Sequence, residues 1–394
     1  MTVGAADHRS DAPIEAFAAA LAGLPKMTPV RLSRLLDGFD PPTAWRALGA
    51  GVHPADPERR FRSAARATDV TEVYETYRRA GVSVLRRDAV GYPARLLGDA
   101  GQPAVLFALG DPSRFDGLPS AALVGTRSAT PYGRDVAAEL GRELSADGVA
   151  VVSGLARGID GAAHTGVVRR PAGGGPPVAV AGTGLDVVYP PQHAELWRTV
   201  AARGAVLSES PLGTHPRRGV FPARNRIIAA LADVVVVVEC HPQGGSLYTA
   251  EAAARRGIPV GAVPGSVRSP ASAGCNALLV DGCFPVRDSA DVVAAIELAR
   301  ADSVSFPGPR RRPPRGSEPS SVGPGPCPTP GRPPRPLPAS EEHRRVWEAV
   351  DEHPTGLETI LLRTGLSVSA VALSCEELLS QGHLRGGRGW WCRA

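Results

Sequence analysis

Three glycine-containing turns combine the residue types that bind phosphate groups. They are Gly125-Thr126-Arg127, the stretch from Ser153-Gly154 to Arg157-Gly158, and Gly244-Gly245-Ser246. A glycine lets a ligand approach the main chain, and the unpaired N–H groups at the start of a following helix attract anions. An arginine adds a planar guanidinium that binds two phosphate oxygens at once. The three turns therefore predict an anion site built from main-chain donors, small hydroxyls and arginines.

A fourth segment adds an aromatic ring and more positive charge. Phe221 precedes Arg224, Asn225 and Arg226, which stand at the start of an expected helix whose apolar residues face a sheet. Polar residues at such a helix start belong at the ligand edge of the sheet, and Phe221 can stack on a nucleic-acid base. One alternative stays open at this point: the arginines only face solvent, and the glycines only close tight turns.

Several other chemistries lack the residues that they require. Lys26 is the single lysine of the chain and lies in its helical amino-terminal region, which excludes Walker-type ATP hydrolysis. The first turn lacks the GxGxxG pattern of dinucleotide-binding proteins. The six cysteines form no CxxC pair and the nine histidines include no HExxH motif. We therefore expect no metal, no other cofactor, and free thiols in a reducing compartment.

Alternating apolar and helical segments position the four phosphate-binding segments. Six short apolar runs alternate with segments of helical periodicity between residues 121 and 300. The run from Val234 to Val238 is apolar without alternation, as expected of a strand covered on both faces. This pattern predicts a Rossmann-like, doubly wound, mostly parallel sheet. Ligands of such sheets bind beyond the carboxyl ends of the strands, so we expect the four segments to converge there.

The sequence around this core predicts three further parts. Residues 1–81 have helical periodicity broken by prolines, and the core follows at 82–300. Residues 301–339 are rich in Pro, Gly, Ser and Arg and predict a linker. Residues 340–394 have the outline of a winged helix. Six arginines against one acid within 307–338 account for the whole formal charge of +5, so any anion site in the core must be a local cluster of arginines.

The expected recognition helix of the winged helix carries Glu376 and Glu377 and no arginine. We therefore rank protein contact ahead of duplex DNA binding for this domain. No stretch of the chain is long and apolar enough to span a bilayer, and the amino terminus lacks the apolar core of a signal peptide. We expect a cytoplasmic protein with no membrane contact.

Six motifs, in order, resemble those of the DprA/Smf family of DNA-processing proteins. They are GTRSATPYG, VVSGLARGIDGAAH, VAVAGTGLDVVYPPQH, LSESPLGTHPRRGVFPARNRIIAAL, VVVVVECHPQGGSLYTAEAAARRGIPVGAVPG and GCNALLVDG. The resemblance covers roughly residues 90–287. The helical amino-terminal region is also similar to the sterile-alpha-motif-like domain of some members, and a carboxyl-terminal winged helix suits the family as well.

This resemblance implies a recombination mediator of natural transformation and no catalytic turnover. Such proteins act as dimers that bind and protect incoming single-stranded DNA, displace single-strand-binding protein and help to load RecA for homologous recombination. Carried over by position, Arg127, Gly154 with its neighbours, Arg224-Asn225 and Gly244-Gly245-Ser246 would form the strand-binding pocket. The family commonly has a serine where this chain has Gly244, which removes one hydroxyl and leaves the backbone donors.

An enzyme is the alternative from another functional class. The stretch GGSLYTAE is similar to the glycine-rich turn of nucleoside-monophosphate phosphoribohydrolases of the lysine-decarboxylase-like group, in which a glutamate and an arginine act on the glycosidic bond. Glu251 with Arg127 would be the equivalent pair here, and Glu239 is the other acid near the glycine turn. Asp160 and His164 lie four residues apart, and we interpret them as a helix-start carboxylate and a packed histidine.

Overall fold

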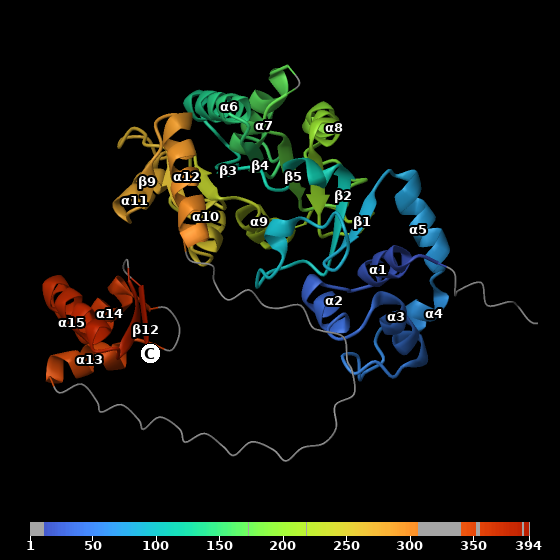
Figure 1. Cartoon of the computed structure of the whole chain (residues 1–394), viewed down its shortest axis with the longest axis horizontal. Helices are drawn as coiled ribbons and strands as arrows, with labels where there is room; N and C mark the ends of the chain where they lie inside the picture. Colours follow the sequence, from blue (N-terminus) through green and yellow to red (C-terminus); the bar gives the residue numbers. More distant parts are fainter. Residues whose placement is uncertain are drawn as a thin grey trace, which may run out of the picture. The chain divides into compact units, whose positions relative to one another are not determined.

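The chain forms two compact units, Met1–Arg311 and Arg312–Ala394 (Figure 1). The computed structural model describes residues 12–171, 173–217, 219–305, 340–351, 355–387 and 390–393. Most of the predicted linker, residues 306–339, lies outside these described residues, whereas residues 301–305 belong to a helix. No helix of the described residues is long and apolar enough to cross a membrane.

The described amino-terminal region contains five helices. These are α1 (Ile14–Gly23), α2 (Pro29–Leu35), α3 (Pro41–Ala50), α4 (Arg62–Ala67) and α5 (Val70–Arg79). Pro29 and Pro41 are the first residues of α2 and α3, where the missing N–H interrupts no helical hydrogen bond. Thr28 and Asp40 cap the same two helices with side-chain oxygens. Pro29 and Pro41, which break the sequence periodicity, therefore start helices.

The described part of the first unit also contains one mixed sheet of nine strands. In spatial order they are β1 (Ser83–Arg86), β2 (Val105–Gly110), β6 (Ala205–Ser208), β5 (Pro177–Ala181), β4 (Ala150–Ser153), β3 (Ser120–Val124), β7 (Val234–Val237), β8 (Val260–Ala262) and β9 (Phe284–Pro285). The strands from β6 to β9 run parallel, while β1 and β2 pair antiparallel at one edge. The predicted mostly parallel, doubly wound sheet is confirmed.

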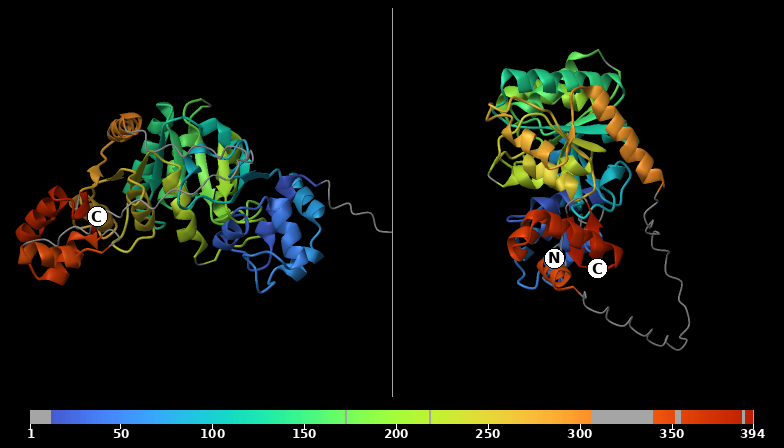
Figure 2. Two further views of the ribbon diagram at one scale, coloured as in Figure 1. Left: turned by 60° about the horizontal axis from the view of Figure 1, so that its bottom comes forward. Right: turned by 90° about the vertical axis from the view of Figure 1, so that its left-hand side faces the viewer.

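Helices cover both faces of this sheet (Figures 1 and 2). On one face lie α6 (Pro131–Ala146), α7 (Ile159–Arg169), α8 (Ala194–Arg203) and α12 (Ser289–Ser305), and on the other α9 (Val220–Ala230), α10 (Leu247–Ala254) and α11 (Ala273–Val280). Alternate residues of β3 serve the two faces: Leu123 packs in the cluster of α6 and α7, and Val124 in that of α9 and α10. Short 3-10 turns are η1 (Ala94–Leu96), η2 (Pro112–Phe115) and η3 (Pro191–His193).

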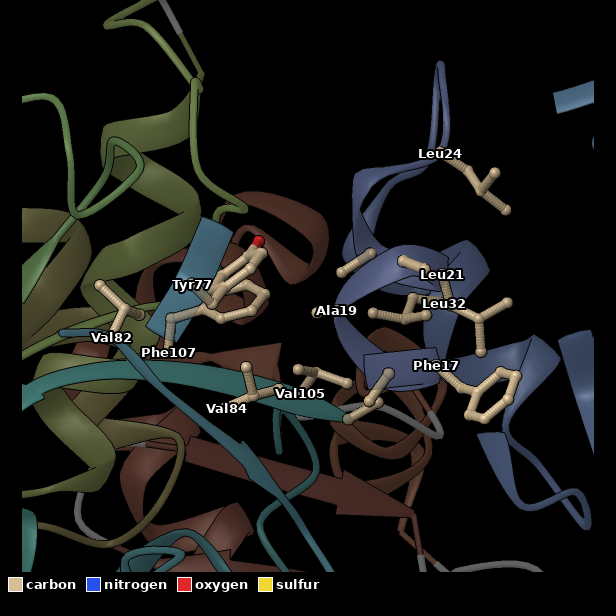
Figure 3. Close-up of a cluster of buried hydrophobic side chains, with 14 of the residues drawn as sticks. Phe17, Ala19, Leu21, Leu24, Leu32, Tyr77, Val82, Val84, Val105 and Phe107 are labelled. Carbon is tan, nitrogen blue, oxygen red and sulfur yellow. The ribbon is translucent and has the colours of Figure 1, made fainter. Parts of the chain in front are cut away.

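The amino-terminal helices share an apolar core with the sheet (Figure 3). Phe17 and Leu21 of α1 belong to the same buried cluster as Phe107 of β2. The ring of Tyr77 stacks on that of Phe107 with centroids 5.0 Å apart, and its hydroxyl accepts a hydrogen bond from the N–H of Leu212 at 3.1 Å. Helices α1 to α5 and the sheet belong to one compact unit, and the domain boundary expected at residue 81 stays a prediction.

The second unit is a winged helix. It contains α13 (Glu341–Ala349), β10 (Thr355–Gly356), α14 (Leu357–Thr364), α15 (Val368–Ser380), β11 (Leu384–Gly387) and β12 (Trp390–Arg393). The three strands pair in the order β10-β12-β11. Gly365, with a φ of +65°, makes the turn between α14 and α15, because a glycine adopts this left-handed conformation without strain. The winged helix predicted from the sequence is confirmed.

Candidate nucleic-acid interface

A cavity of about 490 Å³ opens at the carboxyl ends of β3 and β7. All four predicted segments contribute to its wall: the turn after β3, the glycine turn after β7, the start of α9, and Ala156 of the turn after β4. Nine predicted site residues line it: Gly125, Thr126, Arg127, Phe221, Arg224, Asn225, Gly244, Gly245 and Ser246. We call this cavity the strand cavity. The parallel topology brings these distant segments together, as expected from the position of the turns.

The SGLARG turn after β4 lines a smaller notch beside the strand cavity. Gly154 and Arg157 line this notch of about 20 Å³, and Arg127 and Phe221 line both it and the strand cavity. The side chain of Arg157 is exposed. The SGLARG turn after β4 therefore borders the same edge of the sheet as the turns after β3 and β7.

Arg127 and Phe221 make the central contact of this edge. The guanidinium carbon of Arg127 lies 4.5 Å from the centroid of the Phe221 ring, a cation–π contact. Tyr189 extends the aromatic surface, with its ring centroid 5.6 Å from that of Phe221. Within the described residues, no hydrogen bond or ion pair engages the exposed guanidinium of Arg127. It is a positioned cation that is free to bind an anion.

Arg224 has a different environment, because its guanidinium is buried beneath the cavity wall. Its Nη1 donates hydrogen bonds to the carbonyl oxygens of Gly154, at 2.8 Å, and Val180. Its Nε donates to Oδ1 of Asn225 at 3.3 Å. Arg224 was predicted to be a strand-binding residue, but most of its N–H donors bind protein oxygens. Its main effect is to join α9 to the ends of β4 and β5.

Burial perturbs the charges beneath the cavity. Desolvation lowers the pKa of Arg224 to about 10, partly offset by the nearby Asp160 carboxylate. Desolvation raises the pKa of Asp160, against the opposing effects of Arg224 and Arg127. Asp160 lines the strand cavity, so the cavity contains one acid whose charge is disfavoured. The exposed Arg127 therefore dominates the electrostatics at the mouth.

Residues 83–297 match the family model described as DNA recombination-mediator protein A, and residues 330–379 match the DprA winged helix domain. The chain belongs to the DprA/Smf family. It is 33% identical to protein Smf of Synechocystis sp. over 330 residues, which cover 77% of this chain and 78% of that protein. It is 36% identical to the DNA processing protein DprA of Bacillus subtilis over 220 residues, which cover 56% of this chain and 73% of that protein.

A solved structure shares the fold. The crystal structure of DprA from Streptococcus pneumoniae aligns with a TM-score of 0.62 and 31% identity, covering 71% of this chain and 96% of that one. The conclusion from these comparisons is that the chain is a DNA-processing protein of the DprA/Smf family.

The glycine turn after β7 of this DprA/Smf protein has its own local chemistry. Ser246 is buried, and its hydroxyl donates a hydrogen bond to Sγ of Cys240 at 3.1 Å. The hydroxyl proton is therefore engaged within the protein. A Cβ at Gly244 would lie 2.5 Å from the same sulfur, which explains why a serine does not fit here. Gly245 is exposed and accepts a hydrogen bond from Nδ2 of Asn225 at 3.2 Å.

Three predicted residues lie outside both the strand cavity and the notch. The hydroxyl of Ser153 donates to the carbonyl oxygen of Leu123 at 2.6 Å and ties β4 to β3. Gly158 has a φ of +78°, and a Cβ there would lie 2.2 Å from the carbonyl oxygen of Thr126. These two residues shape the turns that carry the site. The third, Arg226, is engaged elsewhere.

Arg226 forms an ion pair in place of a ligand contact. Its Nη2 lies 2.7 and 2.8 Å from the two carboxylate oxygens of Glu209. The pair of Arg256 with Asp99 lies nearby, because Gly101 packs against both arginines. Burial raises the pKa of Glu209, and the charge of Arg226 opposes that shift. The first pair fastens α9 to the end of β6, and the second fastens the loop before β2 to the end of α10.

The acids considered for sugar chemistry do not line the strand cavity. Both carboxylate oxygens of Glu239 accept hydrogen bonds from Thr130, from its N–H at 2.8 Å and from its hydroxyl at 2.7 Å. Glu251 of α10 is exposed and pairs with Arg255, the C-cap residue of that helix. Among the described residues, no cluster of His, Cys, Asp and Glu could hold a metal ion.

Two aromatic residues and one acid of the site were missed by sequence reasoning. Tyr248 lines the strand cavity with 58% of its surface exposed, and Tyr189 lines the notch. Tyr248 follows the predicted glycine turn by two positions, so its proximity was a usable signal. Asp160 was interpreted as a helix-start residue, which gave no indication that it faces the cavity.

The winged helix offers an acidic and apolar surface on α15. Val368 and Leu373 are more than half exposed, and Glu377 lies 3.1 Å from Nε2 of His343. Its residues Val368–Ser380 include no lysine or arginine. Phosphate binding in the major groove relies on such cations. The described residues of α15 therefore offer no lysine or arginine for phosphate binding, and protein contact by this domain stays a prediction.

Proposed function

We propose that this protein binds single-stranded DNA at the carboxyl edge of its sheet, protects the strand and helps to load RecA on it. The observation that carries this proposal is the position of Arg127 over Phe221 at the mouth of the strand cavity. An unpaired guanidinium suits a phosphate, and a partly exposed aromatic ring beside it suits an unstacked base. Together they can bind the phosphate and the base of one nucleotide.

A single strand fits this arrangement better than a duplex. Bases of a duplex are stacked and paired, and they reach an aromatic side chain only after being extruded at a cost of a few kcal/mol. Phe221 and Tyr248 line the strand cavity, and Tyr189 lines the notch beside it, where an unpaired base can reach these rings. The donors around them are main-chain groups and a guanidinium, which carry no strong base preference. We infer binding with little sequence selectivity.

The mediator role is inferred from membership of the DprA/Smf family. We propose that the protein acts in the cytoplasm during natural transformation, displaces single-strand-binding protein and presents the strand to RecA through a second surface. Dimerisation would place two strand cavities on one particle and raise the effective concentration of the second site once the first is occupied. This mechanism uses binding energy alone.

Two measurements test this function. Gel shifts with labelled single-stranded and duplex oligonucleotides of the same sequence should show preferential binding of the single strand. RecA filament formation on strands coated with single-strand-binding protein should then be stimulated by the protein, with no nucleotide consumed by it. Equal affinity for duplex and single strands would contradict the proposal. Release of adenine from AMP by the protein alone, abolished in Glu251→Ala, would instead favour a phosphoribohydrolase.

A further inference from the structure

A second, larger cavity lies between the amino-terminal helices and the sheet. Its volume is about 560 Å³. One wall comes from the end of α1 and the loop to α2, including Gly23, Leu24 and Met27. The other wall comes from the segments after β5 and β6, including Leu212 and Arg217. We call it the helix–sheet cavity.

The helix–sheet cavity lies along the same edge of the sheet as the strand cavity. It opens at the carboxyl ends of β5 and β6, and the strand cavity opens at those of β3 and β7. In the sheet these strands follow one another in the order β6-β5-β4-β3-β7. The distance from β6 to β7 is four inter-strand spacings, about 19 Å. Gly219 and Arg224 line both cavities. A chain molecule bound at one cavity therefore reaches the other without leaving this edge.

The chemistry of the helix–sheet cavity suits bases inside and phosphates outside. Leu24, Met27 and Leu212 give it apolar walls. Two cations belong to the segments of its walls: Arg217 lines it, and Lys26 lies in the loop between the lining residues Leu24 and Met27. Both are exposed, and within the described residues neither side chain has an ion pair or a hydrogen bond.

The backbone holds Lys26 in an unusual conformation. Its φ is +62°, a left-handed value that side-chain-bearing residues seldom adopt. Nη1 of Arg31 donates a hydrogen bond to the carbonyl oxygen of Lys26 at 2.7 Å and fixes the turn. The single lysine of the chain is thus placed by a strained, braced turn beside the cavity.

We propose that the strand continues from the strand cavity into the helix–sheet cavity, where its bases pack between α1 and the segment after β6. Lys26 and Arg217 bind the phosphates at the rim. This inference rests on the proposed function, because it extends the path of the same single strand. It assigns the amino-terminal helices a direct part in binding, in addition to their packing on the sheet.

Gly23 allows a matched pair of variants. It lines the helix–sheet cavity, and a Cβ built on it meets no atom within 4 Å. Gly23→Ala should therefore leave the cavity open, and Gly23→Trp should fill it. Fluorescence anisotropy then compares a thymidine oligonucleotide of about 20 nucleotides with an abasic strand of the same length. Gly23→Trp should lose about tenfold affinity for the thymidine strand and less than about twofold for the abasic one, and Gly23→Ala should bind like the wild type.

A second pair of variants keeps the proposal testable if Gly23→Trp fails to fold. Lys26→Gln and Arg217→Gln should each make the negative slope of log affinity against log salt shallower by about 0.7. Arg34→Gln is the control, because Arg34 is an exposed cation of α2 outside this cavity, and it should keep the wild-type slope. Unchanged slopes in Lys26→Gln and Arg217→Gln, with equal binding by the two Gly23 variants, would overturn the inference and leave the proposed function intact. A wild-type protein that binds no single strand would overturn both.

Discussion

The guanidinium of Arg127 lies over the ring of Phe221, with its central carbon 4.5 Å from the ring centroid. The two residues come from different connections of the sheet, the turn after β3 and the start of α9. The contact orients the arginine and leaves its N–H groups unengaged within the described residues. It places a cation for phosphate and an aromatic ring for base stacking side by side. Proteins that bind single strands combine these two features.

Arg127→Ala should weaken single-strand binding without unfolding the protein. The side chain is exposed, so its removal leaves no buried group unpaired. Loss of one phosphate contact should make the negative slope of log affinity against log salt shallower by about 0.7. Anisotropy titrations at several salt concentrations measure this slope. Arg198→Ala on α8 is the control, since Arg198 is exposed on a helix away from the cavity. A variant at Arg127 with the wild-type slope would place the site elsewhere.

Arg224→Ala should act mainly on stability, although the sequence analysis assigned Arg224 to the strand-binding pocket. The substitution leaves the carbonyl oxygens of Gly154 and Val180 without their donor and Asp160 without a nearby buried cation. Buried groups left unpaired cost about 1–3 kcal/mol each, so we expect a loss of roughly 2–4 kcal/mol in the free energy of unfolding. Urea denaturation measures it, and a loss below about 0.5 kcal/mol would contradict the structural role.

Two glycines supply the control for Arg224. A Cβ at Gly154 would lie 2.2 Å from Nη1 of Arg224, so Gly154→Ala should displace the guanidinium and destabilise the protein. A Cβ at Gly245 meets no atom within 4 Å, so Gly245→Ala should leave stability unchanged within about 0.5 kcal/mol.

Local patterns made much of this architecture predictable from the sequence. Unbroken apolar runs such as Val234 to Val238 indicate strands buried on both faces, and nearly every apolar run is followed by a glycine turn. The rule that ligands bind beyond the carboxyl ends of parallel strands then predicts that Arg127 and Gly245 meet, as they do in the wall of the strand cavity. The periodicity and the turns carry this information within short segments.

The roles of the individual arginines could not be predicted in the same way. Arg224 and Arg226 are two positions apart, yet one is buried against main-chain carbonyls and the other pairs with Glu209. Which partner each arginine finds depends on residues distant in the chain, so no local pattern separates these two from the free Arg127. The packing of Tyr77 on Phe107, which joins the amino-terminal helices to the sheet, is equally non-local.

His164 should give the stability of the protein a measurable pH dependence. Burial lowers its pKa from 6.5 to about 4, so the neutral form is favoured in the folded state. This contribution is fully present above about pH 6.5 and is lost as the pH falls toward 4, with a slope of up to about 1.4 kcal/mol per pH unit. His164→Gln should remove that slope in urea denaturation at a series of pH values.

The difference between wild type and variant isolates His164. Burial raises the pKa of Asp160 and Glu209, so their contributions to the pH dependence of stability have the opposite sign to that of His164. Because wild type and variant both contain these two acids, their contributions cancel in the difference. His215→Gln, at an exposed position, should keep the wild-type pH dependence. Identical slopes in wild type and His164→Gln would show that the histidine is not held neutral.

Deletion of residues 307–394 should leave a folded protein that still binds single strands. The first compact unit ends at Arg311, and every residue that lines the strand cavity lies between Val124 and Thr249. Thermal unfolding and gel shifts of the truncated chain check this expectation. Complete loss of binding in a truncated protein that melts cooperatively would show that the principal site lies in the winged helix or in the segment before it.

Photocrosslinking tests the central claim most directly, because it reports which residues touch the bound strand. An oligonucleotide that carries photoreactive thymidine analogues is bound to the full-length protein, irradiated and mapped by mass spectrometry of the crosslinked peptides. The account predicts crosslinks at the aromatic residues of the edge, Phe221, Tyr248 and Tyr189. Crosslinks confined to residues 340–393 of the winged helix, with none in the peptides of the carboxyl edge, would contradict it.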